Sequence, residues 1–268
     1  MKTEKLFILF FTILIMSCQK EDGYDTSSKD HFTISSVERN ESYPVWVYLP
    51  DGYKENNKTY QTIYLLDAEW DKEFVARKAR NISQQMKTDN AVIVGIGYGA
   101  DRMDDYSPTK TKDGDGKAGE FMEFIKNELI PKIENDYRVE KDRNSRCIIG
   151  HSLAGLCGAY AFTMSPEIFG NYIILSASFW WDDDIVLQYE QQNRKQLTQN
   201  RNTVYIGVGE TEGPMIIGSK YFYEMLRKYY SHTTTEFVII NGKGHMTSKN
   251  DDIEKGLRFY FNNRETIL

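Results

Sequence analysis

Short apolar runs alternate with longer amphipathic stretches through most of the chain, and this alternation restricts the fold more than any other feature. The apolar runs lie at 63–66, 92–96, 147–149, 172–175, 204–208 and 237–240. Stretches with helical periodicity follow them, at 73–86, 121–137, 153–164, 185–197, 221–230 and 253–261. Continuous apolar strands separated by helices indicate a parallel sheet that is covered on both faces. The sequence therefore predicts an α/β fold with a mostly parallel central sheet and helices on both faces.

Two local patterns refine this prediction. Residues 32–37 and the alternating residues 45–49, which end at Pro50-Asp51-Gly52, predict leading antiparallel strands. Pro131 lies inside the predicted helix 121–137. Because proline has no N–H and its ring clashes with the preceding turn, we expect Pro131 to kink or shorten that helix.

The N-terminus has the pattern of a secretory signal. Lys2 and Lys5 precede the apolar run 6–16, which is too short to span a bilayer as a helix. The run ends in Ile15-Met16-Ser17-Cys18, which resembles the lipobox of bacterial lipoproteins, where the cysteine is lipidated. An ordinary signal peptide with a chance cysteine is the alternative, but the small residue before Cys18 and the aliphatic residue three before it favour lipidation.

This pattern divides the chain into a signal peptide at 1–17, a flexible polar tether at 18–30 and one globular domain at 31–268. It predicts a lipid anchor at Cys18 in the cell envelope, at the outer membrane. Gln19-Lys20-Glu21-Asp22 resembles a signal for export of lipoproteins to the cell surface.

Composition excludes several other classes of protein. The chain has 268 residues, of which 40% are hydrophobic and 27% charged, so one sizeable globular core is expected. The net charge of -6, without a Lys/Arg-rich run, argues against a nucleic-acid partner. Cys147 and Cys157 fall in a predicted strand and helix, so we expect buried core residues and no disulfide. The oligomeric state is left open.

The segment Gly150-His151-Ser152-Leu153-Ala154-Gly155 has the pattern of a nucleophile elbow. An apolar strand enters it, and a helix rich in small residues leaves it. A serine on such a sharp turn has a strained backbone, so the residues two before and two after it must be small. Gly150 and Ala154 meet this requirement, and Ser152 is the predicted nucleophile.

A histidine and an acid follow in the order that such an elbow requires. His31 lies where the predicted tether meets the domain, His151 in the elbow and His232 at a helix end, whereas His245 follows a late strand in a glycine-rich loop. Two carboxylates follow the strand 204–208, and either can orient the imidazole. We prefer Glu212 over Glu210 because its loop can bend toward the histidine. The run Asp182-Asp183-Asp184 is a third alternative, although such a run is more typical of a solvated helix start.

The three residues supply the parts of a serine hydrolase. A serine hydroxyl is a poor nucleophile until a base removes its proton, and His245 is that base. The carboxylate fixes the tautomer of the imidazole and stabilises the imidazolium. The oxyanion needs two backbone donors, for which we predict the N–H groups of Leu153 and Glu69.

Several segments together resemble the esterase family of α/β hydrolases that includes the enterobactin and salmochelin esterases, the feruloyl and acetyl-xylan esterases, S-formylglutathione hydrolase and the mycolyltransferases. Besides the elbow, the segments are Val47-Tyr48-Leu49-Pro50, Tyr64-Leu65-Leu66-Asp67, Val94-Gly95-Ile96, Arg102, Asp105-Tyr106-Ser107-Pro108, Ser176-Ala177-Ser178-Phe179-Trp180-Trp181, Val208-Gly209-Glu210 and Gly244-His245. The resemblance implies an α/β-hydrolase fold and cofactor-free hydrolysis of an extracellular ester, such as a siderophore lactone or an acylated glycan. It also places Arg102, Trp180 and Trp181 near the mouth of the site, as substrate contacts.

Alternatives remain for these residues and for the function. Trp180 and Trp181 fit core packing equally well, and Arg102 can pair with Asp104 or Asp105 on the surface. The segment 113–116 suggests calcium, but Lys117 stands at the next ligand position, so we expect a mobile loop at a lid edge and no metal. An acyltransferase, or a lipoprotein that binds a glycan or siderophore without catalysis, is the alternative function; serine, acid and histidine in order favour the enzyme.

Overall fold

The computed structural model describes residues 29–37 and 39–264. The predicted signal peptide, the lipidation site Cys18 and most of the predicted tether lie outside the described residues. Within the described part of the chain, none of the helices combines the length and apolar character needed to cross a membrane.

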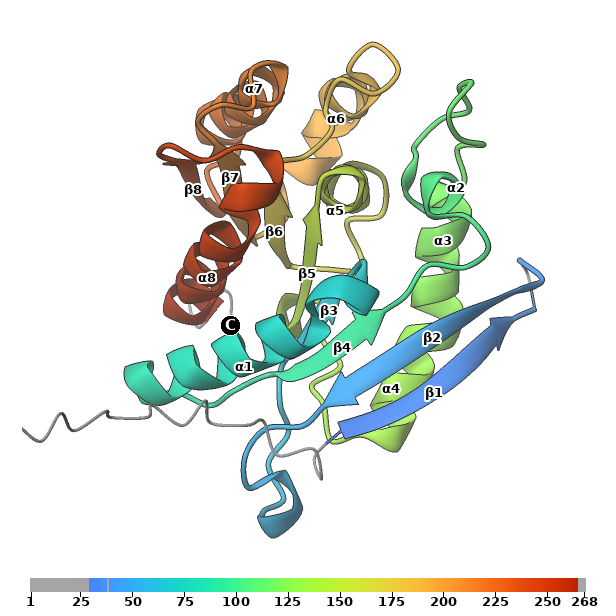
Figure 1. Cartoon of the computed structure of the whole chain (residues 1–268), viewed down its shortest axis with the longest axis vertical. Helices are drawn as coiled ribbons and strands as arrows, with labels where there is room; N and C mark the ends of the chain where they lie inside the picture. The colour runs from blue at the N-terminus through green and yellow to red at the C-terminus, as the bar shows by residue number, and fades with distance from the viewer. Residues whose placement is uncertain (1–28, 38, 265–268) are drawn as a thin grey trace, which may run out of the picture.

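An eight-stranded sheet forms the centre of the molecule (Figure 1). Its spatial order is β1-β2-β4-β3-β5-β6-β7-β8. The two leading strands pair antiparallel with each other and with β4, and the remaining strands run parallel. The strands span Lys29–Ser36 (β1), Glu41–Tyr48 (β2), Thr62–Leu65 (β3), Val92–Ile96 (β4), Arg146–His151 (β5), Asn171–Leu175 (β6), Asn202–Gly209 (β7) and Thr233–Ile240 (β8). The predicted mostly parallel sheet is confirmed.

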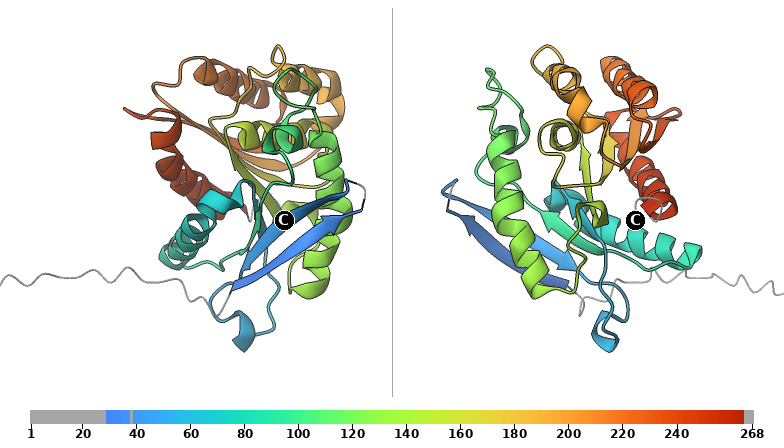
Figure 2. Two further views of the ribbon diagram at one scale, coloured as in Figure 1. Left: turned by 45° about the vertical axis from the view of Figure 1, so that its right-hand side comes forward. Right: turned by 180° about the vertical axis from the view of Figure 1, so that it is seen from behind.

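Helices cover both faces of this sheet (Figure 2). One face carries α1 (Ala68–Met86) and α8 (His245–Asn263). The other face carries α3 (Ala118–Phe124), α4 (Ile130–Asp136), α5 (Leu153–Met164), α6 (Ile185–Leu197) and α7 (Pro214–Tyr229), with the short α2 (Arg102–Tyr106) beside them. Single turns of 3-10 helix lie at η2 (Tyr53–Glu55) and η4 (Arg143–Ser145).

Adjacent residues of the central strands serve two separate cores. In β5, Ile148 packs into the cluster under α3 to α7, while its neighbour Ile149 packs into the cluster under α1 and α8. Because successive side chains of a strand point to opposite faces, a strand covered on both sides must be apolar throughout. This requirement explains the continuous apolar runs in the sequence. Cys147 and Cys157 are buried free thiols, as predicted.

The domain begins slightly earlier than the sequence pattern indicated. Lys29 pairs with Tyr48 at the end of the β1–β2 ladder, so β1 begins two residues before the predicted domain boundary at 31. His31, at the predicted boundary, therefore lies within a strand. Its ring stacks on Trp46 of β2, with ring centroids 5.1 Å apart.

Pro131 changes the helical path without ending it. Helical structure runs from α3 to α4 through a π-helical turn, η3 (Ile125–Leu129), in which the N–H of Ile130 donates to the carbonyl of Ile125. A proline clashes with the carbonyl four residues before it, and a wider turn directly ahead of the proline relieves that crowding. The predicted kink thus takes the form of a π turn.

Candidate active site

Ser152 occupies a strained turn between β5 and α5. Its φ and ψ angles are 63° and -121°, a conformation that L-residues rarely adopt. A Cβ on Gly150 would lie 2.3 Å from the carbonyl oxygen of Ala154, so only glycine fits there. Ala154 is fully buried and its methyl group is accommodated, which accounts for alanine where the strict elbow pattern has glycine. The residue types in the elbow are therefore those that this turn needs.

The turn is fastened to the neighbouring strand. The N–H of Ser152 donates to the carbonyl of Leu175 at the end of β6, across 2.9 Å. The carbonyl of Ser152 accepts the N–H of Ser178 at 3.2 Å. These two bonds hold the serine at the carboxyl edge of the sheet, where parallel strands deliver their loops.

Ser152, His245 and Glu212 lie in one hydrogen-bonded row. His245 Nε2 is 3.0 Å from Ser152 Oγ, and His245 Nδ1 is 2.7 Å from Glu212 Oε2. An ionised carboxylate can only accept, so Nδ1 carries the proton and Nε2 is left to accept from the serine hydroxyl. Three segments that are far apart in the sequence thus supply a nucleophile, a base and a carboxylate with the correct polarity.

The carboxylate of Glu212 is held by more than the histidine. Its Oε1 accepts from Ser176 Oγ at 2.7 Å, from the N–H of Gly209 at 2.5 Å and from Ser248 Oγ at 3.3 Å. Burial acts to raise the pKa of Glu212, but the hydrogen bonds from His245, Ser176 and Gly209 outweigh it and hold this pKa below its ordinary value. The group therefore stays ionised beside the imidazole.

Glu210 points elsewhere. Its Oε2 accepts the N–H of Gly242 at 2.6 Å, so it closes the turn that follows β8. Of the two carboxylates that the sequence offered, the structure brings only Glu212 to His245.

His245 lies in a helix, not in the glycine-rich loop that the sequence suggested. It is the first residue of α8, which begins directly after Gly244. The loop 241–244 is shorter than expected because helical geometry starts before the apolar stripe of α8 becomes visible in the sequence. This start places Ser248, one turn further on, under Glu212.

The sequence analysis assigned no role in the site to Ser176 or Ser248 and did not predict the contact made by His151. Ser176 follows the last residue of β6 with a φ of 43°. The sequence signal available was its position directly after a parallel strand, where polar residues gather around a site. His151 Nε2–H donates to the main-chain carbonyl of His245, and no sequence pattern signals that contact.

A pocket of about 360 Å³ opens at Ser152. The two basic side chains in its wall are both paired: Arg102 makes a bidentate contact with Asp67 at 2.7 and 2.6 Å, and Lys249 pairs with Asp71 at 2.9 Å. The partner of Arg102 is therefore Asp67, not Asp104 or Asp105. The complete lining is Asp67, Trp70, Asp71, Arg102, His151, Ser152, His245, Met246 and Lys249.

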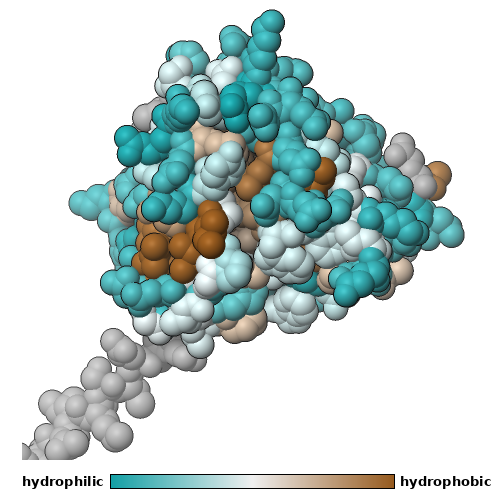
Figure 3. Space-filling view, turned by 90° about the horizontal axis from the view of Figure 1, so that it is seen from above, coloured by the Kyte–Doolittle hydropathy of each residue, from teal (hydrophilic) through white to brown (hydrophobic). Residues whose placement is uncertain are grey.

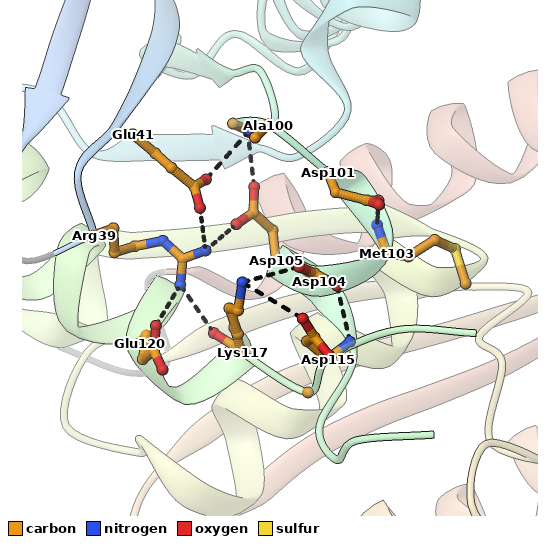
Figure 4. A network of polar contacts seen from close by, with 12 residues as sticks. Arg39, Glu41, Ala100, Asp101, Met103, Asp104, Asp105, Asp115, Lys117 and Glu120 are labelled. Carbon is orange, nitrogen blue, oxygen red and sulfur yellow. Dashed lines mark hydrogen bonds and ion pairs between the residues drawn. The ribbon is translucent and has the colours of Figure 1, made fainter. Parts of the chain in front are cut away.

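A buried ion pair fixes the helix that carries Arg102. Arg39, from the β1–β2 turn, lies 2.6 Å from Asp105 of α2, with side chains 2% and 0% exposed (Figure 4). Asp105 also accepts from Tyr43 Oη and from the N–H of Gly99. Arg39 thus ties α2 to the sheet, and α2 in turn presents Arg102 to the pocket.

The predicted oxyanion donors lie at two helix N-termini. Leu153 is the first residue of α5 and Glu69 the second residue of α1. N–H groups in a first helical turn have no acceptor inside the helix, so they can serve a ligand. Asp67, which precedes α1, adopts a left-handed conformation and donates its N–H to Tyr106 Oη at 3.1 Å.

The adjacent tryptophans differ in burial. Trp181 is 2% exposed and donates its Nε1–H to the carbonyl of Thr109, so it is a core residue and not a substrate contact in this conformation. Trp180 is 53% exposed and lines a different cleft, between α6 and α7. Of the two predicted contacts, only Trp180 is open to a ligand.

The loop 113–116 is held by lysines. Lys110 pairs with Asp115. Lys117 also pairs with Asp115, and the N–H of Asp115 donates to Asp104 (Figure 4). Among residues 29–37 and 39–264, no group of three or more His, Cys, Asp or Glu side chains is arranged to hold a metal ion.

Comparison with known proteins gives a consistent result. Residues 36–217 match the family model described as "Putative esterase". The ferri-bacillibactin esterase BesA of Bacillus subtilis is 28% identical, over 91% of this chain and 96% of the relative. Two crystal structures share the fold. The BES protein from Bacillus cereus has a TM-score of 0.78 and 24% identity, over 97% of this chain and 98% of that protein. An IroE-like serine hydrolase from Shewanella oneidensis has a TM-score of 0.79 and 23% identity, over 88% of this chain and 80% of that protein.

Proposed function

The chain belongs to the esterase family of α/β hydrolases and is a carboxylic ester hydrolase, and from this premise we propose that Ser152, His245 and Glu212 are its catalytic triad. The observation that carries the proposal is the row of two hydrogen bonds, 3.0 and 2.7 Å long, which joins the three side chains. In this row the acceptor nitrogen of the imidazole faces the serine hydroxyl. No metal or cofactor enters the proposed reaction.

In the proposed mechanism, His245 Nε2 takes the hydroxyl proton as Ser152 Oγ attacks the ester carbonyl. The resulting oxyanion is stabilised by the N–H groups of Leu153 and Glu69. His245 then gives the proton to the leaving alcohol, and an acyl-serine remains. Water, deprotonated by the same nitrogen, hydrolyses the acyl-serine. Glu212 keeps Nδ1 protonated and stabilises the imidazolium in both half-reactions.

A siderophore lactone or an acylated glycan is the substrate class that we propose. The support is similarity to a ferri-bacillibactin esterase along nearly the whole chain. The pocket at Ser152 has about 360 Å³, enough for the part of an ester next to the scissile bond but not for a whole macrocyclic siderophore. The rest of such a substrate must lie outside this pocket.

We further propose that Cys18 carries a lipid that anchors the domain to the outer membrane, facing the cell surface. The support is the sequence pattern alone. Metabolic labelling with a tagged palmitate should mark the full chain and not its C18A variant; labelling of both would overturn the anchor.

The triad is tested by hydrolysis of p-nitrophenyl acetate. Ser152→Ala should reduce kcat at least 10³-fold while circular dichroism and thermal unfolding stay unchanged. A fluorophosphonate probe should label the natural chain, and labelling should be lost in Ser152→Ala and slowed in His245→Ala. Unchanged turnover in Ser152→Ala would overturn the proposal, and tight ligand binding without labelling would favour the binding protein.

A further inference from the structure

A second cleft, larger than the pocket at Ser152, lies between α6 and α7. Its volume is about 480 Å³, within the range of small-molecule sites. The lining residues are Trp180, Asp183, Asp184, Leu187, Gln188, Gln191, Pro214, Ile217, Gly218 and Tyr221. The two helices stand side by side on the same face of the sheet (Figures 1 and 2).

Exposed apolar side chains are concentrated at this cleft. Of the nine exposed large apolar side chains among the described residues, three line it: Trp180, Ile217 and Tyr221, which are 53%, 72% and 52% exposed. Viewed from above, the apolar surface of this end of the molecule lies in patches within a hydrophilic face (Figure 3). Two aromatic side chains left open beside a concave surface favour a ligand with a flat or ring-shaped face.

Two walls of the cleft lie close in sequence to residues that hold the proposed triad. Trp180 lies two residues after Ser178, whose N–H binds the carbonyl of Ser152. Pro214 begins α7 two residues after Glu212. α7 also packs very closely on this segment, since a Cβ on Gly218 would lie 2.6 Å from the Cβ of Phe179. A substrate held in the cleft would therefore lie alongside the segments that position the nucleophile and the acid.

The charge of the cleft restricts what it can hold. Asp183 and Asp184 line it, and no lysine, arginine or histidine does so in the part of the chain that the structure describes. Both aspartates have left-handed backbone conformations, with φ of 52° and 60°, and Gln188 braces the turn by donating to the carbonyl of Asp183 at 2.7 Å. The two carboxylates repel an anionic ligand that enters the cleft, but they accept hydrogen bonds from hydroxyl groups.

We propose that the α6–α7 cleft binds an uncharged, hydroxylated ring of the ester substrate and rejects an anionic one. The ring stacks on Trp180 or Tyr221 while its hydroxyl groups donate to Asp183, Asp184 and the glutamine side chains. This inference rests on the proposed function, because it assigns the distal part of the substrate that Ser152 cleaves. It makes Trp180, Tyr221, Asp183 and Asp184 specificity-determining residues.

The test uses methyl esters of ω-(4-hydroxyphenyl)alkanoic acids with two to six methylene groups, and their ring-sulfonated analogues. p-Nitrophenyl acetate, which has no distal ring, reports on the scissile centre alone. The variants are Trp180→Ala, Tyr221→Ala and the double variant Asp183→Asn/Asp184→Asn. Asparagine tolerates the left-handed conformation well, so the double variant removes charge without disturbing the turn. Ile239→Ala, an exposed apolar residue on β8, is the matched control.

We expect Trp180→Ala or Tyr221→Ala to raise KM at least fivefold for the hydroxyphenyl ester of best length, with p-nitrophenyl acetate unaffected. The double asparagine variant should reduce the discrimination against the sulfonated ring at least fivefold. Ile239→Ala should change neither. Unchanged KM in both aromatic variants at every length overturns the cleft proposal while Ser152→Ala remains inactive. Activity that survives in Ser152→Ala overturns the proposed function instead.

Discussion

His151 Nε2–H donates to the main-chain carbonyl of His245 across 2.9 Å, and the two rings lie 4.5 Å apart at an angle of 36°. The residue beside the proposed nucleophile thus holds the backbone of the proposed base. Burial and the neighbouring His245 lower the pKa of His151 to about 4, so its ring remains neutral at physiological pH. It can position the base without competing for its proton.

Two substitutions of His151 should show whether kcat depends on its ring or on its hydrogen bond to His245. His151→Phe removes the donor and should lower kcat about tenfold, since the lost hydrogen bond, worth ~1.4 kcal/mol, no longer holds the start of α8. His151→Gln keeps a donor at the position of Nε2 and should stay within about threefold of the natural enzyme. Steady-state kinetics with p-nitrophenyl acetate between pH 5 and 9 measure both. Equal losses in the two variants would contradict a role for the hydrogen bond.

Substitution of Glu212 should lower kcat much more than substitution of Glu210. Glu212→Gln should lower kcat on the order of 10³-fold, because an amide can hold His245 in the wrong tautomer and does not stabilise the imidazolium. Glu210→Gln, the matched control, touches only the turn at Gly242 and should change kcat less than twofold. Rates over a range of pH measure both variants. A large loss in Glu210→Gln with activity kept in Glu212→Gln would reverse the assignment.

Removing one partner of the buried Arg39–Asp105 pair should destabilise the fold. Arg39→Met leaves the Asp105 carboxylate without its cation, at a cost of ~3 kcal/mol in the free energy of unfolding. Burial already raises the pKa of Asp105 to about 6, so the loss should be greater at pH 8, where the carboxylate is ionised, than at pH 5. Urea unfolding measures this, with Arg39→Met/Asp105→Asn expected to recover part of the loss. A single variant as stable as the natural protein would contradict the prediction.

Asp252 should make stability fall as the pH rises. It is fully buried on α8 and accepts the hydroxyl of Tyr205 at 2.7 Å. Burial raises its pKa to about 7, with the nearby Glu212 adding to the effect. Between the unfolded pKa near 4 and this folded pKa, the native state binds more protons than the unfolded state. The free energy of unfolding therefore decreases across that window and stays lower above it.

The variant Asp252→Asn tests whether the free energy of unfolding decreases as the pH rises because of Asp252. The variant cannot titrate, so its free energy of unfolding should improve relative to the natural protein by about 2 kcal/mol between pH 5 and pH 8. Any cost of the new amide is the same at both pH values and cancels in this comparison. Urea unfolding at the two pH values gives the difference, and an identical pH slope in both proteins would show that Asp252 does not titrate in this range.

Much of the arrangement could be predicted because parallel strands end at a common edge. That rule, together with the elbow pattern, indicated Ser152 and His245 and left Glu212 preferred over Glu210. The structure brings Ser152, His245 and Glu212 within hydrogen-bond distance. The rule could not predict contacts that depend on the residue at which a helix or turn begins. Ser248 reaches Glu212 only because α8 begins at His245.

Pairings between distant segments were also beyond the sequence pattern. Arg102 has carboxylates two and three residues away, yet its bidentate partner is Asp67, across the pocket. Trp180 and Trp181 are chemically identical neighbours, and only the turn that they occupy decides that one is exposed and the other buried. Hydrophobicity and spacing carry no information on either outcome.

The position of His245 at the start of the last helix has a consequence for when activity can arise. A chain that has emerged only as far as β8 possesses the nucleophile and the acid but no base. Glu212, after β7, and His245, at the start of α8, must both reach Ser152, which is far from them in the sequence. Contacts between residues that are far apart in the sequence form late in folding. Hydrolysis should therefore appear only once α8 has joined the fold, and a chain that ends at β8 should not hydrolyse p-nitrophenyl acetate.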